Sequence, residues 1–449
     1  MKKVLIANRG EIAVRIIRAC KEMGIQTVAV YSVADRDSLH VTLADEAVCI
    51  GGARSSESYL KMENIISAAV NTGADAVHPG FGFLSENSVF SKLCADCDIT
   101  FIGPSGAVID NMGNKAKAKS MMIEAGVSVV PGSDGTVTLE EGLIVAREIG
   151  YPVLIKASSG GGGKGMRIAH TESEFSGGYK AAALEAMNSF GDDAMYIEKF
   201  IVNPKHIEFQ ILADSFGNVV HLGERDCSVQ RRNQKILEEA PSSSLTDEQR
   251  KEMGEASVKA AKFVNYCNAG TIEYVVTDDK YYFIEMNTRI QVEHPVTEMI
   301  TGVDLIKEQI KIASGKPLGF TQEDITFNGH SIEARINAED PKMNFRPSPG
   351  EITALHVPGG FGIRFDSAVY TGYKISPFYD SMVGKLIVHG KTRKEAISKM
   401  RRALEELIID GITDNTKLLY LILHNPEFVK GKFNTGFIEK YIDSLLDYR

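Results

Sequence analysis

The chain has 449 residues, a formal net charge of −9 and an isoelectric point near 5.7. This length predicts roughly two to four domains, and the acidic balance argues against nucleic acid or an anionic membrane surface as a partner. No apolar run approaches the ~20 residues that span a bilayer. Arg9 and Glu11 interrupt the apolar run at the N-terminus, which is unlike a signal peptide. We therefore expect a cytoplasmic protein.

The first hundred residues alternate between strand and helix. KKVLIAN and TVAVYS are short apolar strands, a helical pattern between them ends at Gly24, and further αβ units follow up to residue 104. This order predicts a doubly wound parallel sheet. A nicotinamide-dependent oxidoreductase loses its main support, because the first turn reads ANRGEIA and has no GxGxxG.

The six cysteines are scattered through the chain, and only Cys94 and Cys97 have CxxC spacing. A structural zinc site needs about two more ligands at suitable spacing, and the sequence offers none. We expect these two to be reduced thiols near a helix end.

A run of glycines lies between two short strands in YPVLIKASSGGGGKGMRIAH. The first strand ends at Lys156 and the second begins after Gly165. Backbone N–H groups of such a loop can close over phosphate oxygens, and Lys164 adds positive charge. A Walker loop is excluded because Gly165 stands where Ser or Thr is required. We favour a phosphate-covering flap over a flexible linker.

Strands MYIEKFI, HIEFQILAD and VVHLGERD follow, then a polar stretch over 230–241 and a helix that begins near Thr246. After residue 329 the chain is rich in Gly, Pro and short strands, and one amphipathic helix is predicted over 394–410. Its apolar side carries Ile397, Met400, Leu404 and Leu407. We place domain boundaries near residues 112 and 330, which gives regions 1–112, 113–330 and 331–449.

The stretch IEMNTRIQVEHPVTE (284–298) reads as a strand whose polar residues share one face. A tight turn at 278–280 joins strands 271–277 and 281–287. If this hairpin is symmetric about residue 279, Glu273 and Glu285 face each other, with Cβ atoms about 5 Å apart. Opposed carboxylates repel unless a cation lies between them. Asn287 adds another hard oxygen, so Mg²⁺ or Mn²⁺ is expected.

The polar face continues through Arg289, Gln291 and Glu293. A guanidinium beside a metal–phosphate site suits a small planar oxyanion, and a nearby carboxylate could take a proton from that anion. The plain alternative is a solvated hairpin whose like charges are tolerated by water. We favour a row of ligands.

These residues carry a family resemblance. IEMNTRIQVEHPVTE, EKFI, RDCSVQRRNQK, GGGGKGM, HPGFGFLSEN and ARINAED together resemble the biotin carboxylase family of the ATP-grasp superfamily, over nearly the whole chain. The resemblance implies an α/β and α+β fold. Its parts would be a Rossmann-like N-terminal domain, an ATP-grasp core with a glycine-loop lid over about 130–200, and a C-terminal α+β domain.

The resemblance also implies roles for individual residues. Nucleotide contacts would come from Lys115, Lys156, Gly162, Gly163, Glu198, Lys199, Ile201 and His206. Metal ligands that also meet the nucleotide would be Glu273 and Glu285, with Asn287 as a further metal ligand. Bicarbonate would be bound by Lys235, Arg289, Gln291, Val292 (through its backbone) and Arg335. Glu293 would be the general base, and Arg335 would also face biotin.

Some positions depart from the family pattern. Asn233 stands where histidine is usual, which removes an imidazole from one implied nucleotide contact, and Phe81 replaces a common tyrosine near the biotin pocket. Ser159 and Lys164 replace a glycine and an arginine in the loop, changes that we expect to be tolerated. Arg335 also has a structural interpretation, as an arginine salt-bridged to Glu333, Glu339 or Asp340.

The implied activity is ATP- and bicarbonate-dependent carboxylation of biotin through carboxyphosphate, the first half-reaction of a biotin-dependent carboxylase. No AMKM-like segment occurs, so we expect biotin on a separate carrier protein, a carboxyltransferase as second partner, and a homodimer. The final acceptor is open between acetyl-CoA, which would mean fatty acid biosynthesis, pyruvate and another acyl-CoA. Alternatives are another ATP-grasp ligase, of the carbamoyl-phosphate synthetase or purine-pathway carboxylating kind, and an inactive nucleotide-binding regulator.

Overall fold

The computed structural model describes residues 1–159, 165–277 and 280–447. Its N-terminal part is a five-stranded sheet of order β3-β2-β1-β4-β5 in which every pairing is parallel. The predicted doubly wound sheet is therefore confirmed. The strands are β1 (Lys3–Ile6), β2 (Gln26–Ser32), β3 (Glu46–Gly51), β4 (Ala76–His78) and β5 (Thr100–Phe101), and the helices are α1 (Gly10–Glu22), α2 (Leu39–Leu43), α3 (Met62–Thr72) and α4 (Ser88–Asp96).

The CxxC cysteines lie near a helix end, as expected. Cys94 is buried in α4, Cys97 caps the end of that helix, and both are free. In the described part of the chain, the side-chain groups that could hold a metal lie elsewhere.

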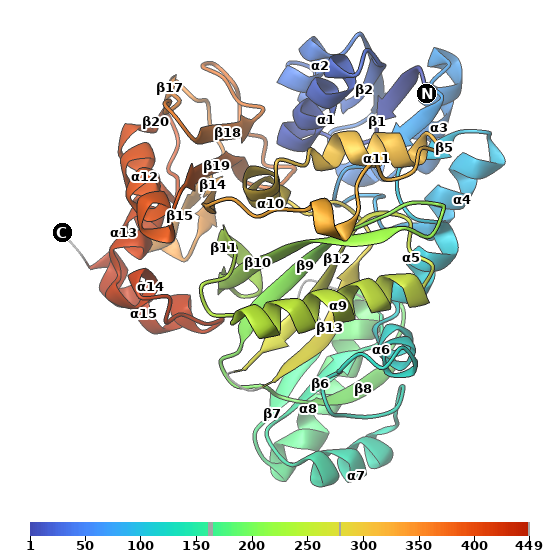
Figure 1. Cartoon of the computed structure of the whole chain (residues 1–449), viewed down its shortest axis with the longest axis vertical. Coiled ribbons are helices and arrows are strands. Elements are labelled where there is room, and N and C mark those ends of the chain that lie inside the picture. Colours follow the sequence, from blue (N-terminus) through green and yellow to red (C-terminus); the bar gives the residue numbers. More distant parts are fainter. Residues whose placement is uncertain (160–164, 278–279, 448–449) are drawn as a thin grey trace.

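A small three-stranded sheet of order β7-β6-β8 forms the end of the molecule farthest from the N-terminal sheet, at the bottom of Figure 1. The elements of this region are α7 (Leu139–Ile149), β6 (Val153–Ala157), β7 (Met166–Ala169), α8 (Glu172–Phe190) and β8 (Met195–Lys199). Helices α5 (Gly106–Gly113) and α6 (Lys115–Glu124) lead to it from the N-terminal part. Strands β6 and β7 are the predicted pair on either side of the glycine run. The tip of that run, 160–164, lies outside the described residues.

The largest sheet has eight antiparallel strands in the order β13-β12-β9-β10-β11-β14-β19-β18. They are β9 (Lys205–Ala213), β10 (Val219–Arg231), β11 (Gln234–Ala240), β12 (Asn268–Val276), β13 (Tyr281–Asn287), β14 (His330–Asn337), β18 (Ile363–Ser367) and β19 (Met382–Gly390). Strand β11 pairs with β14 from Leu237–Ala334 to Ala240–Ser331. One sheet thus joins the central and C-terminal regions.

The stretch 230–241, expected only to be polar, is a hairpin formed by the end of β10 and by β11. Its turn places Arg232 and Asn233 in the left-handed region, at φ 48° and 65°. Asparagine tolerates this conformation well. The strand character was hidden because charged and polar residues of this segment face other charged residues in the interior, so no apolar alternation marks it.

Helices cover both faces of the large sheet: α9 (Asp247–Phe263), whose N-terminus is capped by Thr246 as predicted, α10 (His294–Thr301) and α11 (Leu305–Ala313). The C-terminal region adds α12 (Arg393–Glu406), α13 (Thr416–His424), α14 (Pro426–Val429), α15 (Phe437–Leu446) and short strands β15 (Glu339–Asp340), β16 (Arg346–Pro347), β17 (Ala354–His356) and β20 (Ile408–Asp410). Short 3-10 helices lie at Val33–Asp35, Ser55–Glu57, Gln322–Asp324 and Pro341–Met343.

The predicted amphipathic helix is α12, and its four apolar residues are buried in the C-terminal core as expected. The predicted end at residue 410 was wrong, because the helix stops at Glu406 and residues 408–410 form β20. Ile408 and Ile409 pair there with His356 and Leu355, and β-branched residues fit such a pairing better than a helix. Among the described residues, no helix has the length and apolar character that crossing a membrane requires.

Candidate active site

The hairpin of β12 and β13 brings the two predicted carboxylates together. Glu273 and Glu285 are directly paired, as predicted. The assumption of a symmetric turn was wrong nearer the tip, where Tyr274 pairs with Phe283. Ile284 is the extra residue of a β-bulge, which restores the register at the two acids. The turn residues 278–279 themselves lie outside the described residues.

The polar row does not continue as a strand beyond Asn287, contrary to our expectation. Residues 288–293 form a loop that leads into α10. The backbone N–H of Thr288 donates to Glu86 Oε1 at 3.1 Å instead of to a neighbouring strand. Glu86 comes from the N-terminal region, so a contact distant in sequence ends the strand.

The side chains of this loop nevertheless converge. Arg289 donates from Nη2 to Asn287 Oδ1 at 3.1 Å, from Nη1 to Gln291 Oε1 at 2.9 Å and from Nε to Glu86 Oε2 at 2.9 Å. Gln291 in turn donates to Glu273 Oε1 at 3.1 Å. The guanidinium is therefore held in a fixed orientation beside the paired acids.

Lys235 is the centre of the charged cluster. Its Nζ lies 2.6 Å from Glu208 Oε2, 3.0 Å from Glu273 Oε1 and 2.6 Å from Glu293 Oε1. Burial opposes the charge of this ammonium, but the surrounding anionic groups raise the pKa of Lys235 well above its ordinary value. The lysine is thus a permanent cation among three carboxylates.

Glu293 is fully buried and carries a negative charge. Burial alone would raise its pKa, but Lys235, Arg335 and Arg225 outweigh that effect and hold the pKa well below 4.5. Arg335 Nη2 lies 2.8 Å from Glu293 Oε2, and Arg335 Nε donates to Glu238 Oε1 at 2.6 Å. Arg335 reaches this acid from β14, in the C-terminal part of the sheet.

The structural interpretation of Arg335 named the wrong partners. The carboxylates bonded to Arg335 are Glu238 and Glu293, rather than Glu333, Glu339 or Asp340. Glu339 instead accepts a hydrogen bond from Ser381 at 2.5 Å. Pairing of β14 with β11 explains the difference, because it brings Glu238 next to Arg335 from a strand almost 100 residues away.

The three lysines among the predicted nucleotide residues differ in what they contact. Lys115 Nζ lies 2.7 Å from Glu285 Oε2, and Lys156 Nζ lies 2.9 Å from Glu198 Oε2. Lys199 turns away, since its Nζ donates to the backbone carbonyls of Gly150 and Tyr151. Ile201 is partly buried in the segment after β8. Gly162 and Gly163 lie outside the described residues.

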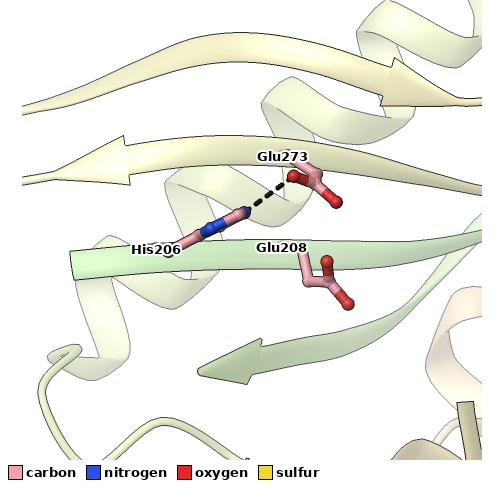
Figure 2. A group of neighbouring side chains, drawn as sticks. All are labelled: His206, Glu208 and Glu273. Atoms are coloured by element: carbon pink, nitrogen blue, oxygen red, sulfur yellow. Dashed lines mark hydrogen bonds and ion pairs between the residues drawn. The ribbon is translucent and has the colours of Figure 1, made fainter. Parts of the chain in front are cut away.

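Figure 2 shows His206 and Glu208 on β9 and Glu273 on the neighbouring strand β12. His206 Nε2 is 2.7 Å from Glu273 Oε2, and ligand atoms of the three side chains lie within 4.8 Å of one another. Glu208 and Glu273 already share the ammonium of Lys235, however. We therefore interpret this trio as an ion-pair cluster rather than as a separate metal site.

The metal ligands implied by the sequence fit a hard divalent cation. Glu273 and Glu285 are paired across two strands, and Lys115 offsets only part of their charge. Asn287 Oδ1 accepts from Arg289 and keeps a second lone pair for a cation. Two carboxylates and an amide oxygen are typical ligands of Mg²⁺ and Mn²⁺.

Several residues of the site were missed from the sequence: Glu86, Lys119, Glu208, Arg225, Glu238 and Lys385. Glu208 could have been found, because the period of two in HIEFQILAD places it on the same face as His206. Lys385 donates to the carbonyl oxygen of Val292 at 2.7 Å, so the backbone predicted to meet bicarbonate is fixed from β19. Nothing local in the sequence marks that contact.

The fold and the site together define an ATP-dependent ligase of the ATP-grasp type. The N-terminal 109 residues match the biotin carboxylase N-terminal domain, residues 114–321 match the carbamoyl-phosphate synthase L chain ATP-binding domain, and residues 333–440 match the biotin carboxylase C-terminal domain. The chain belongs to the biotin carboxylase family.

Known biotin carboxylases are similar to this chain along almost its whole length. The chain is 58% identical to biotin carboxylase 1 of Bacillus subtilis (strain 168), over 98% of this chain and 99% of that protein. A biotin carboxylase–beta-gamma-ATP complex from Campylobacter jejuni superposes with a TM-score of 0.96 at 50% identity, and the match covers 98% of each chain.

A second solved structure is the biotin carboxylase domain dimer of Hydrogenobacter thermophilus 2-oxoglutarate carboxylase, in complex with MgADP, ADP and bicarbonate. It has a TM-score of 0.97 at 54% identity and covers 100% of this chain and 99% of its own. The activity of this chain is accordingly that of a biotin carboxylase, and the oxidoreductase and inactive-regulator hypotheses are set aside.

Proposed function

We propose that the chain carboxylates biotin on a separate carrier protein, using ATP and bicarbonate, with Glu293 as the base and Arg335 as the group that serves both substrates. One observation carries this assignment: Glu293 lies between Lys235, at 2.6 Å, and Arg335, at 2.8 Å. An anion bound there meets two cations and a proton acceptor at once. The same arginine lies on β14, from which a second substrate can be reached.

ATP is proposed to lie along Lys115, Lys156, Glu198 and His206, under a lid that includes Gly162 and Gly163. Lys199 and Ile201 would contribute their backbone, since the Lys199 ammonium is already bonded to two carbonyls. Glu273, Glu285 and Asn287 would hold Mg²⁺ or Mn²⁺, which neutralises phosphate charge when bound. Asn233 would contribute little to nucleotide binding, because it is exposed in a tight turn.

Bicarbonate is proposed to bind between Lys235, Arg289, Gln291 and the backbone of Val292. Glu293 removes its proton, and the resulting carbonate oxygen attacks the γ-phosphorus of ATP and releases ADP. A carboxylate with a low pKa is a weak base. However, the incoming anion draws Lys235 and Arg335 toward itself, and loss of those contacts raises the basicity of Glu293.

The carboxyphosphate so formed separates into CO₂ and phosphate. Phosphate then takes the ureido N–H proton of biotin, and the ureido nitrogen attacks CO₂ to give N-carboxybiotin. Arg335 stabilises the negative charge that develops on the ureido oxygen. Its planar guanidinium can do so while it keeps one hydrogen bond to Glu238.

A carrier protein, a carboxyltransferase partner, a homodimer and a cytoplasmic location are part of this proposal. The relative from Bacillus subtilis is named a biotin carboxylase, which supports biotin, and so a protein that carries it, as the partner. The structure from Hydrogenobacter thermophilus is described as a dimer, which supports two copies. Acetyl-CoA, pyruvate and another acyl-CoA are candidates for the final acceptor, and the names of two relatives add 2-oxoglutarate.

The deciding experiment measures ADP release in Mg²⁺ with and without bicarbonate, and then with free biotin added. We expect ADP release to require bicarbonate, and carboxybiotin to form when biotin is present. Turnover that does not respond to bicarbonate would overturn the proposal. Dependence on ammonia or on an aminoimidazole would instead indicate one of the other ATP-grasp ligases.

A further inference from the structure

Glu198 is bonded to two lysines rather than to one. Lys156 Nζ lies 2.9 Å from its Oε2, and Lys119 Nζ, from α6, lies 3.2 Å from its Oε1. All three side chains are at most 9% exposed. Two ammonium groups and one carboxylate leave this pocket with one excess positive charge.

The two lysines reach Glu198 from different elements. Lys156 lies on β6, which pairs with β8 and leads into the glycine run. Lys119 lies on α6, one turn after Lys115. Each lysine contacts a different oxygen of the carboxylate, so one ammonium can leave while the other stays.

The position of Lys119 matters when Lys156 moves to a phosphate. A buried carboxylate that loses its only counter-ion is strongly disfavoured. With Lys119 in place, Glu198 stays paired when the Lys156 ammonium turns toward a polyphosphate. Without Lys119, Lys156 would have to satisfy Glu198 and the phosphates together.

We propose that Lys119 is a positioning residue of the nucleotide site, which neutralises Glu198 and so frees Lys156 to bind the phosphates of ATP. This inference rests on the proposed binding of ATP. It assigns to Lys119 no contact with the nucleotide.

The test is the dissociation constant of MgATP, measured by calorimetry for Lys119→Met and Lys119→Arg. We expect binding about tenfold weaker for Lys119→Met and near that of the unmodified protein for Lys119→Arg, which keeps the charge. The KM for bicarbonate should stay the same in both. Lys117→Met is the matched control, since Lys117 is exposed on the same helix.

A double-mutant cycle separates this role from simple packing. In a Glu198→Gln background no buried charge needs a counter-ion, so Lys119→Met should weaken ATP binding no further. An equal loss in both backgrounds, or unchanged ATP binding in Lys119→Met, would overturn the inference. If Lys119→Met is too unstable to assay, Lys119→Gln takes its place under the same criteria. If the unmodified protein fails to bind MgATP, the proposed function itself has failed.

Discussion

Glu285 is the residue on which the metal assignment depends most directly, because it is the less enclosed of the two paired acids. We expect Glu285→Gln to weaken MgATP binding and to lower ATP turnover at least tenfold, about 1.4 kcal/mol of transition-state stabilisation. Lys115 would lose its partner at 2.7 Å as well. Steady-state turnover at several Mg²⁺ concentrations checks this. Normal turnover at ordinary Mg²⁺ would mean that the paired acids are not metal ligands.

The roles of Arg289 and Arg335 can be distinguished by the ratio of ADP to carboxybiotin that each variant produces. Arg289 lies beside the paired acids, so Arg289→Ala should abolish both bicarbonate-dependent ADP release and biotin carboxylation. Arg335→Ala should keep much of the ADP release and lose most carboxylation, since carboxyphosphate would form and decay. Arg335→Lys should recover little, because an ammonium cannot make the same planar contacts. An unchanged ratio of ADP to carboxybiotin in Arg335→Ala would assign that residue a structural role.

Glu333 is a buried acid opposite Glu238, and neither of its side-chain oxygens has a hydrogen-bond partner within the described part of the chain. Burial raises its pKa well above 4.5; Lys385 and Arg335 oppose this, while Glu238 and Glu293 add to it. The folded state therefore binds a proton that the unfolded state releases. This contribution to stability is present below about pH 4.5 and is lost as pH rises.

We accordingly expect Glu333→Gln to gain stability relative to the unmodified protein as pH increases from 5 to 8. The glutamine keeps the shape of the protonated acid but cannot ionise. Urea denaturation at pH 5 and at pH 8 measures the difference in unfolding free energy. A difference that stays constant between these two pH values would show that Glu333 does not titrate on unfolding.

At the scale of elements, Arg225 ties three strands to a helix. From β10, its fully buried guanidinium bonds Glu208 and Gln210 on β9, Thr271 on β12 and Thr297 on α10. These hydrogen bonds and the ion pair with Glu208 satisfy the buried charge, which explains how Arg225 can lie in the interior of the sheet.

Arg225→Met should destabilise the fold by about 3 kcal/mol, because it leaves the buried Glu208 with Lys235 alone. Arg147→Met is the control, since Arg147 pairs with Glu172 in an exposed position and such pairs contribute at most about 1 kcal/mol. Thermal unfolding of both variants checks the prediction. Equal melting temperatures would contradict it.

The elements that the sequence predicted well are those whose pattern is local. The β12–β13 hairpin and α12 follow from a period of two, a polar turn and an apolar helix face. The end of β13 could not be predicted, because the Thr288 N–H is taken by Glu86 from 202 residues away. The same holds for the partners of Arg335, which depend on how β14 pairs with β11.

At the scale of the whole molecule, the eight-stranded sheet makes the C-terminal region part of the active site. A chain cut after residue 329 would lose β14, β18 and β19 and leave β11 as an unpaired edge. The buried carboxylate of Glu238 would also lose its ion pair with Arg335. We expect residues 1–329 to aggregate on size-exclusion chromatography. A monodisperse fragment that unfolds cooperatively would contradict this expectation.

The shared sheet also limits how such enzymes can be recombined. A genetic crossover between two relatives at the apparent boundary near residue 330 would join β11 of one parent to β14 of the other. The Glu238–Glu333 pairing and the reach of Arg335 to Glu293 would then have to match between parents. Crossovers in the loops before β9 or after β19 avoid that junction. Natural recombination and laboratory shuffling should therefore retain those recombinants in which all eight strands come from one parent.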